Sequence, residues 1–210
     1  MTQVATPSRP ARRAFNMEPG ESYTIRRKVL KIFGAAFHIY DPQGQLVGFC
    51  KQKAFKFKED IRIYTDESCS AELLVIKARS IIDFGATYDV TTPEGVVVGS
   101  FRRKGMASTF LKDSWMLFDA GGRQMASLKE EGSLLAVLRR YVDYVSLLSP
   151  QKFTLARADG TALARYRQHF NPFVYRLSVA VLADDPQIDD LMLLAAGSLI
   201  TAIEGRQSNG

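Results

Sequence analysis

Eight basic side chains lie close together in the first 58 positions of this 210-residue sequence. Alternation along an extended strand places Lys51 and Lys53 on one face and Lys56 and Lys58 on the other. Strands pair about 4.8 Å apart, so several of these cations could converge on one phosphate or carboxylate group. The alternative is a solvated strand edge whose lysines prevent aggregation. The candidate anion-binding residues are Arg26, Arg27, Lys28, Lys31, Lys51, Lys53, Lys56 and Lys58.

The net charge of the chain is concentrated in the same region. The whole sequence holds 28 Lys and Arg against 22 Asp and Glu, a net charge of +6. Residues 1–58 carry 11 basic and 3 acidic side chains, or +8, whereas residues 59–210 carry 17 and 19, or −2. At an anionic membrane a basic cluster contributes on the order of 1 kcal/mol per charge. No RNA-binding signature accompanies the charge, so nucleic acid is not an expected partner.

The sequence offers little material for a catalytic or metal centre. It contains no G-x-S-x-G elbow, P-loop, H-E-x-x-H motif or dinucleotide fingerprint. His38 alternates with apolar neighbours on a predicted strand, and His169 stands just before a turn-like Asn-Pro pair, so both are interpreted as ordinary histidines. Cys50 and Cys69 are too few for a disulfide framework and are expected to be reduced. We therefore expect no enzymatic activity, no cofactor and no metal.

A repeated template organises the chain into β-hairpins. Four segments, 37–51, 88–102, 115–129 and 153–167, each begin with an aromatic residue and have an apolar residue at the third place. A glycine follows seven positions after the aromatic residue, and a Lys or Arg ends each segment. Apolar residues two apart are typical of a strand with one buried face, and a glycine after Asp or Pro is typical of a tight turn. The four turn glycines are Gly44, Gly95, Gly122 and Gly160.

The last apolar segment indicates how the hairpins close. Residues 191–203 carry no charge and have no polar face, and Asp185-Pro186 before them is a good helix start. A bilayer span needs about 20 apolar residues, so this helix is expected to be enclosed by protein. We predict a closed antiparallel β-barrel of about twelve strands around a helix over residues 187–204. The four small residues Ala195, Ala196, Gly197 and Ser198 would keep the helix slim.

These features resemble the tubby C-terminal-like superfamily, which includes tubby domains, phospholipid scramblases and LURP-one-related proteins. The resemblance rests on the aromatic-x-apolar-x-Asp-x-x-Gly hairpins and on the apolar helix followed by Glu204. The segments 25–32 and 37–41 look closest to the LURP-one-related branch. The resemblance implies twelve strands around a central hydrophobic helix, over residues 21–206. It leaves a flexible basic arm at residues 1–20 and a tail at 207–210.

The same resemblance implies a non-catalytic binding module that engages anionic phospholipid headgroups or another phosphate-bearing partner. We expect it in the cytoplasm, with peripheral contact to a membrane. Scramblase-like lipid transfer and a protein-partner scaffold are the alternatives. Scramblases carry a calcium-binding segment before the last helix, where this chain has Asp184, Asp185, Asp189 and Asp190. The EF-hand spacing is absent, so we expect helix capping by Asp185 and dipole compensation by the other three.

Overall fold

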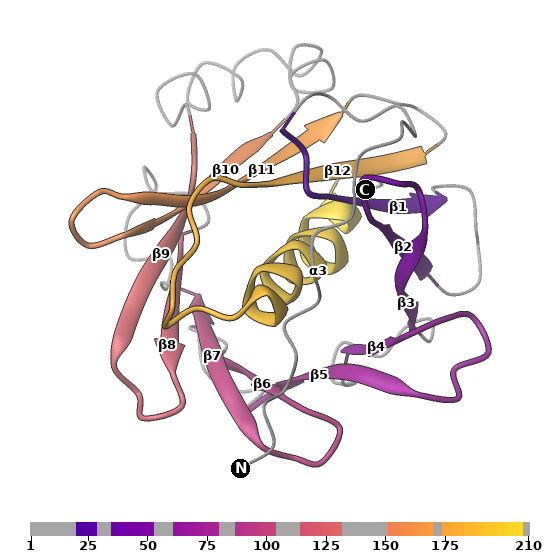
Figure 1. Cartoon of the computed structure of the whole chain (residues 1–210), viewed down its shortest axis with the longest axis horizontal. Helices are drawn as coiled ribbons and strands as arrows, with labels where there is room; N and C mark the ends of the chain where they lie inside the picture. The colour runs from indigo at the N-terminus through magenta and orange to yellow at the C-terminus, as the bar shows by residue number, and fades with distance from the viewer. Residues whose placement is uncertain are drawn as a thin grey trace.

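Twelve antiparallel strands form one closed barrel in the computed structural model (Figure 1). The structure describes residues 20–28, 35–52, 61–79, 87–103, 114–131, 151–169 and 174–207. Each strand pairs with its neighbours in the sequence, and β1 closes the ring on β12. This arrangement confirms the predicted barrel. The strands are β1 (Tyr23–Lys28), β2 (Ala35–Tyr40), β3 (Leu46–Gln52), β4 (Ile61–Tyr64), β5 (Glu72–Ala78), β6 (Thr87–Thr91), β7 (Val97–Arg103), β8 (Trp115–Asp119), β9 (Gln124–Glu130), β10 (Lys152–Arg157), β11 (Ala162–His169) and β12 (Val174–Val181).

The hairpin template is present in the structure, and a fifth hairpin shares its geometry. The four template glycines have φ between +77° and +89°, a range that favours glycine. Each of these glycines donates its amide N–H to the carbonyl oxygen three residues earlier. In each hairpin the strand register shifts just after the apolar residue that stands third in the template. The β4–β5 hairpin has the same shift and the same turn hydrogen bond, from Cys69 to Asp66. Cys69, with φ +56°, takes the place of the glycine there.

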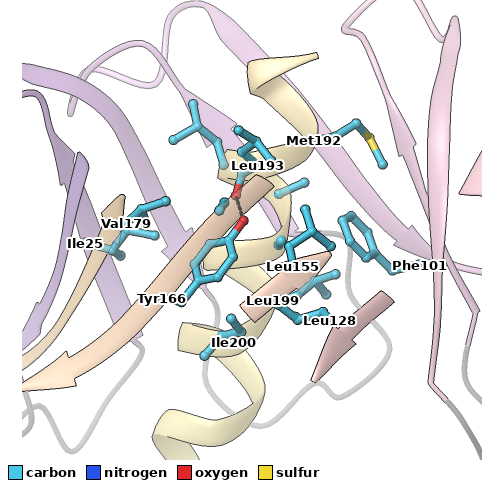
Figure 2. Close-up of a cluster of buried hydrophobic side chains, with 14 of the residues drawn as sticks. Ile25, Phe101, Leu128, Leu155, Tyr166, Val179, Met192, Leu193, Leu199 and Ile200 are labelled. Atoms are coloured by element: carbon cyan, nitrogen blue, oxygen red, sulfur yellow. Dashed lines mark hydrogen bonds between the residues drawn. The ribbon is translucent and has the colours of Figure 1, made fainter. Parts of the chain in front are cut away.

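The helix α3 (Asp190–Gln207) runs through the middle of the ring of strands (Figure 1). Residues 192–202 are all buried, and Ala195, Ala196 and Ser198 are completely so. The hydroxyl of Tyr166 on β11 donates to the carbonyl of Leu193 at 3.0 Å, which ties the helix to the wall (Figure 2). The predicted enclosure of a slim apolar helix is thus confirmed. Among the described residues, no helix has both the length and the apolar character needed to cross a membrane.

The helix begins three residues later than predicted, and its capping residue is a different aspartate. The N–H of Leu191 donates to Oδ1 of Asp189 at 2.8 Å, so Asp189 is the N-cap. Asp185, the expected cap, instead accepts the N–H of Gln187 at 2.8 Å and forms an ion pair with Arg157 on β10. The ion pair holds the turn at 185–188 against the barrel, and the chain enters the helix only after that turn.

Candidate anion-binding surfaces

Basic residues cluster at one end of the barrel. At this end the odd-numbered strands finish and the even-numbered strands begin. The two residues of each strand nearest this end include nine Lys or Arg and one acidic residue, Glu130, a net charge of +8. We call these nine cations the basic rim. They are Arg27, Lys28, Lys51, Arg62, Lys77, Arg102, Arg103, Lys129 and Lys152.

Acidic residues cluster at the opposite end. The connections there are residues 41–45, 65–71, 92–96, 120–123, 158–161 and 182–189. They hold eight carboxylates and one guanidinium, that of Arg123, a net charge of −7. We call the eight carboxylates the acidic rim: Asp41, Asp66, Glu67, Glu94, Asp159, Asp184, Asp185 and Asp189. Among the described residues, charge is therefore separated along the barrel axis.

The structure places the eight predicted residues in several environments. Lys51 is exposed on the basic rim, where Lys28 ends β1. Arg27 points into the barrel, is 5% exposed, and lies over the Tyr175 ring at 5.7 Å, so it is a core-facing cation. Arg26 points outward, half-buried, with its guanidinium 5.9 Å from the centre of the Tyr40 ring. Four of the predicted lysines lie outside the described residues: Lys31, Lys53, Lys56 and Lys58.

A second group of polar side chains lies on the outer wall, where β11, β12 and the segment before β1 meet. Nη2 of Arg176 donates to Oε2 of Glu21 at 3.0 Å, and Nε2 of His169 lies 3.3 Å from Oε1 of the same carboxylate. Oγ of Ser178 lies 3.0 Å from that His169 nitrogen. We call these four residues the Glu21 cluster. Burial opposes ionisation of Glu21, but hydrogen bonds from His169 and Ser178 and the charge of Arg176 outweigh it and lower its pKa.

The Glu21 cluster contains a serine, a histidine and a carboxylate, yet its geometry differs from that of a catalytic relay. In a relay the carboxylate contacts one ring nitrogen of the histidine and the nucleophilic hydroxyl contacts the other. Here both Glu21 and Ser178 contact Nε2 of His169. Ser178 is also 4% exposed and its hydroxyl donates to the Arg167 carbonyl at 3.3 Å. The arrangement therefore suits anion anchoring rather than hydroxyl activation.

Comparison with protein families accounts for the barrel and its helix. The family model described as LURP-one-related matches residues 47–197, which is more than half of the chain. The chain belongs to the LURP-one-related family. This family is part of the tubby-like and scramblase-like superfamily, so the chain is a binding domain of the tubby-like type. A search of curated proteins gave no match.

The structure of this LURP-one-related chain also adds functional candidates that the sequence did not suggest. Lys77, Lys129 and Lys152 come from the part of the chain whose net charge is slightly negative, and only strand pairing brings them to one rim. Arg176 could have been found from its place in β12, because alternation puts it on the outer face of the strand, as the one charged residue among mostly apolar ones. No pattern in the sequence identified Glu21 as a candidate, because its partners are about 150 residues away in the chain.

In the acidic segment before α3 of the LURP-one-related chain, Asp185 and Asp189 stabilise the structure around the helix start. Asp189 caps the helix and Asp185 pairs with Arg157, whose hydrogen bond is the main reason that the pKa of Asp185 is lowered. Asp190 lies in the first turn, near the positive end of the helix dipole. Within the described ranges no group of three or more His, Cys, Asp or Glu side chains is placed to hold a metal ion.

Proposed function

We propose that this chain is a non-catalytic module that docks its basic rim on the phosphate groups of anionic phospholipids at the surface of a membrane. The observation that supports the proposal is the separation of charge, +8 at one rim and −7 at the other. Six of the nine rim cations are exposed on the outer wall. These are Lys51, Arg62, Lys77, Arg102, Lys129 and Lys152.

The proposed orientation has the barrel axis upright on the membrane. The basic rim then faces the anionic headgroups and the acidic rim faces away from them, which is the favourable alignment of a charge-separated molecule in that field. The sequence segments 29–34 and 53–60 join strand ends of the basic rim, so the proposal includes Lys31, Lys53, Lys56 and Lys58. We place the protein in the cytoplasm, bound peripherally and reversibly.

The test compares two triple variants that change the net charge equally. Lys77→Gln, Lys129→Gln and Lys152→Gln remove three rim charges, whereas Arg9→Gln, Arg12→Gln and Arg13→Gln remove three charges from the N-terminal arm. Each variant is sedimented with phosphatidylcholine vesicles, with and without phosphatidylserine, over a series of salt concentrations. At about 1 kcal/mol per Lys near an anionic surface, the rim variant should bind about a hundredfold more weakly.

Three results would contradict the proposal. The first is a wild-type protein that does not sediment with phosphatidylserine vesicles at low salt. The second is an arm variant that loses as much affinity as the rim variant, since net charge rather than the rim would then decide binding. The third is vesicle binding that persists at high salt, because exposed charges farther apart than about 8–10 Å are largely screened at 0.1–0.15 M salt.

Scramblase-like lipid transfer, the alternative function, would require a large change in the structure. Lipid transfer by insertion of α3 would require the helix to leave the barrel. Its residues 192–202 are buried against the strands, so their departure would open the core of the protein. Peripheral docking leaves the barrel intact and is the function that the geometry supports best.

A further inference from the structure

The hairpins bring exposed cations to the basic rim at regular intervals. The second-last residue of each of the strands β3, β5, β7 and β9 is a Lys or Arg, and it is exposed. The residue before it is buried in the core in every case, so alternation points the cation outward. The template supplies three of these cations, and the β4–β5 hairpin supplies the other. We call them the spaced cations: Lys51, Lys77, Arg102 and Lys129.

The strand register fixes the distance between neighbouring spaced cations. Lys77 stands opposite Asp89 on β6. Asp89 in turn stands opposite Ser100 on β7, and Arg102 follows two residues later. The steps across β4 and across β8 repeat this pattern. Each step covers two strands and two residues, which is about 12 Å between backbones at about 4.8 Å per strand and 3.3 Å per residue.

This spacing is too wide for two spaced cations to share one phosphate group. Contacts between a cationic N–H and an anionic oxygen are about 2.7–2.9 Å long, so two cations on one phosphate need nitrogen atoms within about 6 Å of each other. The closed wall curves between successive odd-numbered strands (Figure 1), so side chains that point outward from it diverge. The guanidinium of Arg102 also lies over the Phe118 ring, 4.9 Å from its centre, on the outer wall. Each spaced cation is thus placed to meet a phosphate of its own.

We propose that the basic rim binds an array of separate phospholipid headgroups, one at each spaced cation, and that it responds to the density of anionic lipid rather than to the structure of one headgroup. Binding of this kind rests on the proposed docking of the rim and narrows its ligand class. A headgroup with several phosphates on one ring needs a cluster of cations, which these four residues do not form. Positions this far apart without a shared partner contribute additively, so none of the four should be indispensable.

Two series of vesicles with matched surface charge test the ligand class. In the first, phosphatidylcholine vesicles contain increasing amounts of phosphatidylserine. In the second, smaller amounts of phosphatidylinositol bisphosphate replace the phosphatidylserine and give the same zeta potential. The full chain is sedimented with both series at low salt. We expect equal binding wherever the zeta potentials are equal, and an affinity that rises more steeply than in proportion to the phosphatidylserine content, because several lipids are bound at once.

Single variants test whether the spaced cations act independently. Lys51→Gln, Lys77→Gln and Lys129→Gln should each weaken binding to phosphatidylserine vesicles about fivefold, the effect of one Lys near an anionic surface. Any two of these changes together should weaken it about 25-fold, because the positions contribute independently. Arg123→Gln removes an equal charge at the acidic rim, where Arg123 pairs with Asp119 at 3.2 Å. It is the matched control and should leave the affinity unchanged.

Two results would overturn the inference while leaving the docking itself in place. The first is binding at least tenfold tighter to the phosphatidylinositol bisphosphate vesicles at equal zeta potential. The second is one lysine variant that abolishes binding while the other two leave it intact, since a local pocket would then hold the ligand. A wild-type chain that sediments with neither series would instead contradict the docking of the basic rim, and the array with it.

Discussion

At Gly197, α3 lies very close to the barrel wall. A Cβ atom at this position would lie 2.8 Å from Cδ1 of Ile25 and 3.5 Å from carbons of Tyr166 and Val179. Ile25 is completely buried, and Figure 2 shows it beside Val179 and near Tyr166 against the helix. We therefore expect Gly197→Ala to push the Ile25 side chain out of its present position.

Two opposing effects determine the size of the change. Ala is favoured over Gly in a helix by about 1 kcal/mol, whereas overpacking a core costs about 1–3 kcal/mol. The single Gly197→Ala substitution should thus lie between neutral and about 2 kcal/mol destabilising. Ile25→Val removes the clashing Cδ1 and by itself costs about 0.5–1.5 kcal/mol. In the double variant the new methyl group fills the vacated space, so the two changes should compensate by about 1–2 kcal/mol.

Urea unfolding of the four proteins in this cycle measures the compensation. The chain has one tryptophan, Trp115 on β8, which is 4% exposed and should report the opening of the barrel by fluorescence. The close approach of helix and wall predicts that the double variant is more stable than the sum of the single changes allows. Changes that add within about 0.5 kcal/mol would show that the two positions do not interact, and would refute the packing argument.

Two further predictions concern the turns of the acidic rim. The pKa of Asp185 is lowered, chiefly by Arg157, so its contribution to stability is present above about pH 4 and is lost as the pH falls through the folded-state pKa. Asp185→Asn should destabilise the protein at neutral pH, and its free energy of unfolding should fall less than that of the wild type as the pH drops below about 4. Urea unfolding measured over a series of acidic pH values would contradict this if the two proteins lost stability in parallel. Cys69→Gly should raise the free energy of unfolding by up to about 1 kcal/mol, because a φ of +56° is strained for a residue with a side chain. An unchanged urea midpoint would show that the surrounding turn already absorbs the strain.

The fold was predictable because local signals recur. Each template hairpin combines a period of two with a turn residue that needs positive φ, and four such hairpins together with the remaining strands leave few ways to arrange the chain. The β4–β5 hairpin did not match the template, because Cys69 replaces the glycine and the turn is longer. The start of α3 was misplaced because Asp185 and Asp189 both precede a possible first turn. Only the ion pair with Arg157, a tertiary contact, distinguishes them.

The candidate surfaces were far less predictable than the fold. Counting charges along the sequence assigned the excess to the first 58 residues, whereas the barrel sorts charges by strand end. Lys51 and Lys152 meet the same rim only because β3 and β10 run in opposite directions. The Glu21 cluster depends on closure of β1 on β12, which joins residues about 150 positions apart. Such contacts follow from the register of the whole barrel and leave no local pattern.

The charge separation is larger than the fold itself requires. The N-terminus of α3 lies at the acidic rim and its C-terminus points to the basic rim, so the rim charges have the signs that compensate the helix dipole. That dipole corresponds to only about half an elementary charge at each end, against net rim charges of −7 and +8. The remaining like charges around each ring repel one another and oppose folding. A partner of opposite charge at the basic rim would reduce that repulsion, so the proposed docking on anionic phospholipids would also relieve a strain that the fold itself does not need.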